Sequence, residues 1–188
     1  MEPALWPTLA DAARVFEDRD IRFALIGGLA VSLRGQPRMT VDVDLVILAD
    51  LDRALQLVRE LASTPFAPLF SGVEEVVTRS YILPLRHRVT GIRVDVVIGM
   101  SGFERQAVER AAPVAIGELR VPVVAVEDLL VMKALAGRPQ DEQDIRGLIA
   151  TQRDAIDWHR CLTLARQLGD AIDIDLVGRL EAARGQEA

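Results

Sequence analysis

The sequence has little of what a secreted or membrane-spanning protein needs. Its 188 residues include one cysteine, Cys161, so no disulfide can form within the chain. No stretch approaches the roughly 18–20 consecutive apolar residues that a membrane-spanning helix requires. The first twenty residues, MEPALWPTLADAARVFEDRD, carry acids and prolines in place of the basic region and apolar run of a signal peptide. We therefore expect a cytoplasmic protein with no membrane association.

Positive charge is also in short supply. The chain has 22 basic residues against 28 acidic ones, and its formal net charge is −6. This balance disfavours broad, sequence-independent binding to nucleic acid, because such binding depends on neutralising phosphates, although a local basic face can coexist with an acidic total. Lys133 is the only lysine in the sequence. Because lysine occurs only once, the position of Lys133 calls for an explanation.

Apolar residues make up half of the chain, which is enough for the core of one domain of this length. Helical periodicity predicts helices at 8–19, 29–33, 51–62, 126–135 and from about 141 to 183, the last with a break near Gly169. Short apolar runs predict strands at 22–26, 40–48, 75–85 and 92–98, and a hairpin around Gly117-Glu118. We expect the α/β (α+β) class: a small mixed β-sheet flanked by helices in residues 1–138, and a C-terminal helical segment, 139–188, packed on it as one compact unit.

Two aspartates interrupt the apolar strand in the stretch LIGGLAVSLRGQPRMTVDVDLVI, residues 25–47. Aspartate is depleted in strands, and a buried carboxylate costs several kcal/mol unless its charge is compensated. Because side chains alternate along a strand, Asp42 and Asp44 point to one face with Cα atoms roughly 6.5–7 Å apart. Carboxylates so placed can converge on a pair of divalent cations.

A third aspartate, Asp95, stands in the middle of another predicted strand, IRVDVVIG. If that strand lies beside the first, three carboxylates line one patch, and three uncompensated negative charges there would be costly. Mg²⁺ (or Mn²⁺) is the natural partner, because it prefers carboxylate and phosphate oxygen. We therefore expect Asp42, Asp44 and Asp95 to be metal ligands.

The glycine pair Gly27-Gly28 follows a predicted strand and precedes a predicted helix. A turn without Cβ atoms at a helix N-terminus presents backbone N–H groups and a positive dipole end to an anion. A metal site beside a phosphate-binding turn is typical of phosphoryl or nucleotidyl transfer, where positioning and charge neutralisation supply most of the catalysis.

Each of these signals has a simpler explanation when it is taken alone. A D-x-D pair also occurs by chance at a frayed strand edge, in calcium loops and in sugar-nucleotide enzymes. The calcium loop is excluded here, because Leu45, Val46 and Ile47 stand where it needs oxygen ligands and a glycine. Asp95 could be one salt-bridged carboxylate in a strand, and a glycine pair is often only a turn. Their order and spacing carry more weight than any one of them.

The order GG-x-A, a short helix, R-x-T-x-D-x-D and a later strand of the form VDV resembles the minimal nucleotidyltransferase superfamily, which has a DNA-polymerase-β-like fold. The sequence is more closely similar to the AbiEii/AbiGii type, the toxin component of toxin–antitoxin and abortive-infection systems. That group has a later Lys–Arg–Asp helix motif, which the stretch KALAGRPQDEQDI, residues 133–145, resembles. The resemblance covers roughly residues 20–150.

The resemblance implies a role for each matching position. Asp42 and Asp44 would be the metal-binding pair, and Asp95 the third carboxylate, which in this superfamily can act as general base on the attacking hydroxyl. Lys133 would contact the nucleotide phosphates and take part in catalysis, with Arg38 as a second phosphate contact.

The glycine turn matches the superfamily with one departure. Gly27 and Gly28 would bind phosphate, but Leu29 stands where the usual signature has a serine, so a hydroxyl contact is missing. The GG-x-A variant occurs in the wider group, and we interpret the change as a mark of the subgroup.

The remaining polar residues near the helix motif have ambiguous roles. Asp141 fits a helix N-cap, and Asp144 is the better candidate for the nucleotide-site acid that orients Lys133 or Arg138, although the choice between the two aspartates stays open. His87 and His159 have no cysteine or carboxylate at ligand spacing, and we expect both at the surface. Cys161 is not expected to act as a catalytic thiol.

These observations together predict a magnesium-dependent nucleotidyltransferase that transfers an NMP from an NTP to a hydroxyl or phosphate. The acceptor could be an RNA end (tRNA in the toxin group), a protein side chain, or a small molecule such as an antibiotic, and an antitoxin protein would be a partner. The alternative is a non-catalytic nucleotide-binding member of a toxin–antitoxin pair. A sugar-nucleotide glycosyltransferase is disfavoured, because only about 40 residues precede Asp42.

Overall fold

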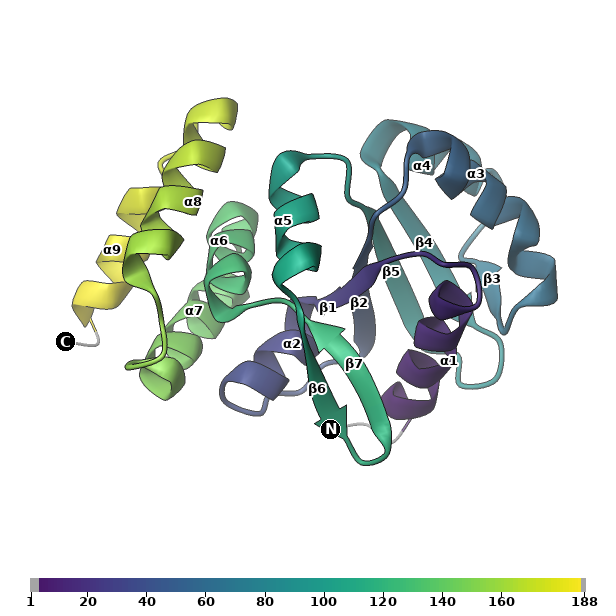
Figure 1. Ribbon diagram of the computed structural model, residues 1–188, viewed down its shortest axis with the longest axis horizontal. Coiled ribbons are helices and arrows are strands. Elements are labelled where there is room, and N and C mark those ends of the chain that lie inside the picture. Colours follow the sequence, from purple (N-terminus) through teal and green to yellow (C-terminus); the bar gives the residue numbers. More distant parts are fainter. Residues whose placement is uncertain (1–3, 187–188) are drawn as a thin grey trace.

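The computed structural model describes residues 4–186, which form a mixed seven-stranded sheet with helices around it (Figure 1). The strands run in the order β3-β4-β5-β2-β1-β7-β6, with β2–β5 and β1–β7 parallel and the other pairs antiparallel. Their bounds are β1 Phe23–Ile26, β2 Asp42–Ile47, β3 Phe66–Pro68, β4 Ile82–His87, β5 Arg93–Ile98, β6 Ala112–Ile116 and β7 Leu119–Val123. The expected class, a small mixed sheet flanked by helices, is confirmed.

Helices separate most of these strands, except that β5 follows β4 and β7 follows β6 directly, and after β7 only helices follow within the described residues. Their bounds are α1 Leu5–Glu17, α2 Gly27–Arg34, α3 Leu51–Glu60, α4 Val73–Ser80, α5 Gly102–Arg110, α6 Val126–Ala136, α7 Pro139–Gln152, α8 Trp158–Ile172 and α9 Leu176–Gln186, with a 3₁₀ turn at Leu61–Ser63. No helix within residues 4–186 is long and apolar enough to cross a membrane.

Strands β2 and β5 have one wholly apolar face, and their aspartates lie on the other. Strands β2 and β5 lie parallel and in register, so residues that face each other across the pair share a side of the sheet. On one side the valine and leucine side chains are buried and pack against α1 and α3; this side includes Val43, Leu45, Val94 and Val96. The aspartates of both strands therefore lie together on the opposite side.

Helices α6 to α9 gather at one end of the molecule, beside the β1–β7 part of the sheet and away from β3 and β4 (Figure 1). Helix α6 contacts α7, α8 and α9, and α7 also contacts α2. The C-terminal helical segment thus reaches the part of the chain that follows the glycine pair.

The predicted strand at 75–85 is wrong in its first half. Residues Val73–Ser80 form helix α4, and only Ile82–His87 form strand β4. The buried side chains of this helix, Val73 and Val77, are four residues apart, which is a helical rather than an alternating pattern. Tyr81 ends the helix in the left-handed conformation, at φ 55°. Gly72 marks the start of this helix, but no glycine or proline stands between Ser80 and Ile82 to mark the boundary with β4.

The helical stretch predicted from about 141 to 183 is broken in two places, at 153–157 and at 173–175, rather than once near Gly169. Gly169 lies inside α8, which continues to Ile172 and ends at Asp173 in the left-handed conformation. A Cβ atom at Gly169 would come within 2.5 Å of the backbone oxygen of Ile174. This glycine therefore allows the following turn to fold back onto the helix.

One of the two expected surface histidines is buried. His87 is 2% exposed, and its ring contacts the Oδ2 atom of Asp11 at 3.1 Å and the hydroxyl of Thr90 at 2.8 Å. It joins α1 to the end of β4, which is a contact between distant segments that local spacing does not reveal. His159 is exposed, as expected.

Candidate active site

The sheet register brings three predicted site residues together. Asp44 on β2 lies directly opposite Asp95 on β5, and Asp42 lies opposite Arg93. On the other side of β2, Asp44 pairs with Ile26, the last residue of β1, so the glycine pair begins next to it. The three carboxylates and Arg93 therefore form one polar patch on the sheet.

The glycine pair is packed against this patch. Gly27 has φ +67°, and a Cβ atom added to it would lie 1.9 Å from the Oδ2 atom of Asp44. A Cβ atom on Gly28 would lie 2.4 Å from Arg38 Nη2 and 2.9 Å from Thr40 Oγ1. The backbone N–H of Gly28 donates a hydrogen bond to the carboxylate of Asp44. Both glycines are thus required by close approach, and the start of α2 already faces negative charge.

Replacing Gly27 with alanine is expected to destabilise the protein by about 2 kcal/mol or more, because the new Cβ atom adds a clash with Asp44 to the strain of a positive φ. Gly91 has φ +73° but nothing within 4 Å of its added Cβ, so Gly91→Ala isolates the strain and should cost about 1 kcal/mol. Urea denaturation of the two variants checks this difference, and equal losses would contradict it.

The carboxylate of Asp44 is disfavoured in its charged form by its surroundings. Burial, followed by the negative charges of Asp42 and Asp95, raises its pKa from 3.8 to about 6. The hydrogen bond from Gly28 and the positive charge of Lys133 act in the opposite direction without cancelling the effect. The patch therefore carries more negative charge than its own cations compensate.

The raised pKa of Asp44 predicts a pH-dependent stability in EDTA. The folded state binds more protons than the unfolded state between pH 3.8 and about 6, so the free energy of unfolding should fall as pH rises through this window. The total loss is on the order of 2–3 kcal/mol, and the curve flattens above it. Denaturation of the wild type and of Asp44→Asn from pH 4 to 7.5 tests this, because the variant should lack that part of the slope. An identical slope in both would contradict the assignment.

The other two carboxylates are held by different partners. The hydroxyl of Thr40 donates to Asp42 Oδ1 at 3.0 Å. Asp95 is bound by Arg93 through both oxygens: Nε lies 2.9 Å from Oδ1 and Nη2 lies 2.9 Å from Oδ2. Arg93 is a residue of this site that was not predicted from the sequence. The signal was present, because residues two apart on a strand share a face.

Lys133 lies at the centre of a buried ionic cluster. Its Nζ atom is 3.0 Å from Asp141 Oδ1 and 2.9 Å from Asp144 Oδ2, and the other oxygen of Asp144 lies 2.9 Å from Nε of Arg38. Lys133, Asp141 and Asp144 are at most 5% exposed. The cluster joins α6, α7 and the loop before β2, and Lys133 is close enough to lower the pKa of Asp44. The structure thus brings both ends of the helix motif to the polar patch.

The sequence predicted Asp141 as the N-cap of α7, and this prediction is wrong. The helix begins at Pro139 with Arg138 as its N-cap, and the Asp141 carboxylate accepts a hydrogen bond from the backbone N–H of Arg138 at 3.1 Å. A proline at the first helical position sets the start two residues earlier, because its missing N–H needs no partner there. Asp144 contacts Lys133, as expected, and Arg38 rather than Arg138.

Asp141 is strongly held in its charged form. Burial opposes ionisation, but hydrogen bonds from Arg138 and Lys133 outweigh it and lower the pKa of Asp141 to about 2. The Arg138 side chain is 70% exposed while it makes these contacts. It is therefore a guanidinium at the rim of the cluster that remains accessible to solvent.

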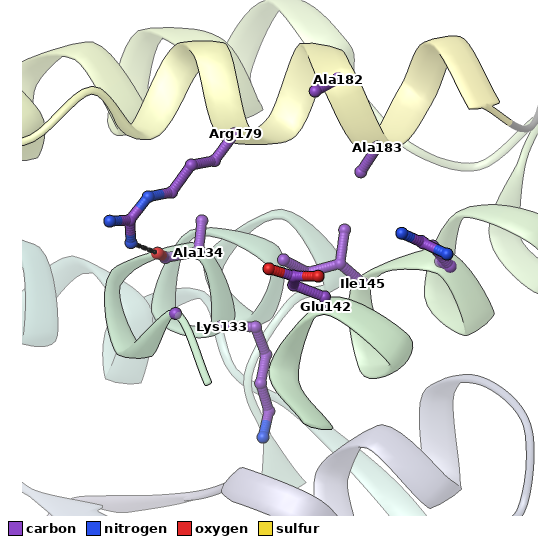
Figure 2. A pocket seen from close by; sticks show the side chains of 9 residues that line it. Lys133, Ala134, Glu142, Ile145, Arg179, Ala182 and Ala183 are labelled. Carbon is purple, nitrogen blue, oxygen red and sulfur yellow. Dashed lines mark hydrogen bonds between the residues drawn. The ribbon is translucent and has the colours of Figure 1, made fainter. Parts of the chain in front are cut away.

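A pocket of about 340 Å³ lies between α6, α7 and α9 and adjoins the cluster at Lys133. Figure 2 shows the stem of Lys133 at its wall, with the amino group directed away from α9. Arg179 closes another side and donates to the backbone oxygen of Ala134 at 2.7 Å. The pocket shares Lys133 with the site but contains none of the three expected metal carboxylates.

The patch offers the right donor atoms for a hard cation, but not all of them are free. Asp42 and Asp44 supply the oxygen ligands that Mg²⁺ prefers. The raised pKa of Asp44 indicates that nearby positive charge does not fully compensate its negative charge. Within residues 4–186, no three His, Cys, Asp or Glu side chains are arranged to hold a metal ion. On this face, Asp95 is the carboxylate that is engaged elsewhere, by Arg93.

Comparison with known proteins agrees with this geometry. Residues 9–187 match the family described as "Nucleotidyl transferase AbiEii toxin, Type IV TA system". No curated protein matches the chain.

Among solved structures, the antibiotic-resistance factor ANT(2'')-Ia is similar with a TM-score of 0.63 at 11% identity, covering 92% of this chain and 95% of that one. A nucleotidyltransferase-like protein from Paracoccidioides brasiliensis has a TM-score of 0.54 at 23% identity, covering 93% and 91%. The lincosamide antibiotic adenylyltransferase LnuA has a TM-score of 0.53 at 17% identity, covering 79% and 96%. At these identities the structural similarities establish the fold alone.

Proposed function

The chain belongs to the AbiEii family of nucleotidyl transferase toxins of type IV toxin–antitoxin systems, and on this premise we propose that it transfers an NMP from an NTP to a hydroxyl or phosphate acceptor with the help of Mg²⁺ or Mn²⁺. The observation that carries the proposal is the register of β2 and β5. It places Asp42, Asp44 and Asp95 on one face, directly beside the Gly27-Gly28 turn.

In this proposal each part of the site has a separate task. A divalent cation bound by Asp42 and Asp44 would supply positive charge for the triphosphate. The N-terminus of α2 would donate N–H groups to phosphate oxygens, with the N–H of Gly28 exchanging its present acceptor, Asp44, for phosphate. Lys133 and Arg38, the expected phosphate contacts, are paired with the carboxylates of the ionic cluster, from which they add positive charge to the site. Arg138, exposed at the rim, would offer a further guanidinium to the same phosphates.

The proposed reaction is an in-line displacement at the α-phosphorus. The acceptor oxygen forms a bond to this phosphorus, the bond to the β-phosphate oxygen breaks, and pyrophosphate leaves. The proton of the acceptor hydroxyl passes to the carboxylate of Asp95, which acts as general base. This last step requires that Asp95 first be released from Arg93.

The acceptor is the least constrained part of the proposal. An RNA end such as tRNA, a protein side chain and a small molecule would all present a hydroxyl to the same face. The family assignment also implies an antitoxin partner. The alternative, a nucleotide-binding member without catalysis, is disfavoured because all three carboxylates are present and lie together.

Incubation of the purified protein with each α-labelled NTP, Mg²⁺ and either tRNA or cell extract tests the proposal. Label should appear on an acceptor with the wild type and not with Asp42→Ala/Asp44→Ala. Asp52→Ala is a matched control, because Asp52 is an exposed carboxylate on α3, outside the polar patch. If none of the proteins transfers label or binds nucleotide, the proposed function is wrong. Binding without transfer would favour the non-catalytic alternative.

A further inference from the structure

The contact between Arg93 and Asp95 is unusual for a carboxylate that is expected to bind a metal. Both oxygens of Asp95 receive an N–H group of the same guanidinium, each at 2.9 Å. A paired arrangement of this kind is the strongest contact that arginine makes with a carboxylate. In this state Arg93 occupies one lone pair on each oxygen, which weakens Asp95 as a cation ligand and as a base.

Arg93 is also close to the other two carboxylates. It lies opposite Asp42 in the sheet register. The hydrogen bond to Asp95 raises the pKa of Arg93 against the effect of burial, with further contributions from the charges of Asp95, Asp42 and Asp44. Arg93 therefore supplies positive charge to the same patch that a bound cation would occupy.

The exposure of the pair shows which partner can move. The Arg93 side chain is 52% exposed, whereas that of Asp95 is 20% exposed. Asp95 is the only hydrogen-bond partner of the Arg93 side chain within the described residues. The guanidinium can swing into solvent without breaking another contact, while the shorter carboxylate remains on the sheet.

We propose that Arg93 is a displaceable counter-ion of Asp95: it holds the third carboxylate, and a divalent cation that binds at Asp42 and Asp44 must displace it before Asp95 can take part in the reaction. Arg93 is thus a positioning residue that acts through Asp95. The inference rests on the proposed function, since it assumes a cation site at Asp42 and Asp44.

The proposal makes metal binding and the Arg93 contact compete for Asp95. Removing the arginine should therefore tighten the binding of a cation. Mn²⁺ is a suitable probe, because the signal of free Mn²⁺ in electron paramagnetic resonance gives the bound fraction without an activity assay. We expect Arg93→Ala and Arg93→Gln to bind Mn²⁺ about fivefold more tightly than the wild type, which corresponds to losing an ion pair of ordinary strength.

A double-mutant cycle separates this competition from a general effect of charge. Removing any nearby positive charge would favour cation binding at Asp42 and Asp44, and this effect would persist without the Asp95 carboxylate. Competition for Asp95 would not persist. The gain from Arg93→Ala should therefore fall below about twofold when it is measured in an Asp95→Asn background.

Arg86 provides a matched control on the neighbouring strand. It lies opposite Arg93 in the register of β4 and β5, is exposed, and donates to the backbone oxygen of Gly91 rather than to Asp95. Arg86→Ala should leave Mn²⁺ affinity within about twofold of the wild type.

The outcomes distinguish this inference from the proposed function. A gain with Arg93→Ala that disappears in the Asp95→Asn background supports the counter-ion role. A gain of equal size in both backgrounds, or no gain, overturns it, while Mn²⁺ binding that depends on Asp42 and Asp44 would still support the proposed cation site. If Mn²⁺ binds to none of the proteins, alone or with a non-hydrolysable NTP analogue, both the inference and the cation site are wrong.

Discussion

Asp44→Asn should lower the rate of nucleotidyl transfer at least about a thousandfold, because it removes charge at the centre of the polar patch without removing volume. Asp44 lies opposite Asp95, contacts the start of α2, and has a pKa raised to about 6 by its surroundings. An amide retains an oxygen that can accept the Gly28 hydrogen bond, but it is a far weaker ligand for a cation. The rate is measured as transfer of α-labelled NMP to the acceptor.

The same substitution should not weaken the fold. A neutral side chain at this position no longer suffers from burial or from the charges of Asp42 and Asp95, so in EDTA at pH 7.5 the variant should be at least as stable as the wild type. Asp52→Asn is the matched control and should leave both rate and stability unchanged. A transfer rate within tenfold of the wild type, in a folded Asp44→Asn protein, would exclude Asp44 from the catalytic site.

The second large effect is expected at Lys133, whose removal leaves two buried carboxylates without their shared cation. Asp141 and Asp144 are 0% and 4% exposed. Breaking a buried ion pair by deleting one partner typically costs about 3–5 kcal/mol, and Lys133→Met should reduce the free energy of unfolding by about that amount. It should also reduce transfer strongly, because Lys133 supplies positive charge near Asp44. Urea denaturation and the labelled-NTP assay measure the two effects.

Arg138→Met is the matched control for this prediction. Arg138 contacts the same Asp141 carboxylate, but its side chain is 70% exposed, so solvent screens the pair. Its loss should cost about 1 kcal/mol or less. If the two variants lose the same stability, the burial of the cluster does not determine its strength, and the assigned role of Lys133 is wrong.

The alternation of side chains along a strand was enough to predict that Asp42 and Asp44 share a face. Asp95 was expected to join them on the condition that its strand lies beside the first, a condition that the sequence alone did not establish. The register confirms that these residues lie side by side. Their role in metal binding stays a prediction.

Contacts between segments that are distant in the sequence could not be predicted from the alternation of side chains. The surroundings that bury His87 include Asp11 on α1, far away in sequence. Arg38 meets Asp144 across more than a hundred residues, and nothing in the local pattern joins them. The boundary between α4 and β4 was not predicted, for a different reason. A short apolar run fits a helix as well as a strand until its burial pattern is known.

The placement of the ionic cluster has a consequence for how the enzyme is made. Lys133 precedes its partners Asp141 and Asp144, and synthesis proceeds from the N-terminus, so a growing chain contains the glycine turn and all three sheet carboxylates well before the cluster can form. Only when α7 has left the ribosome can Lys133 be neutralised and Arg38 be held. A chain that ended after α6 would keep the polar patch of the sheet. It would lack the carboxylates of α7 that hold the side chains of Lys133 and Arg38 beside this patch. For a member of a toxin family, the complete site would then form only after α7 has been synthesised.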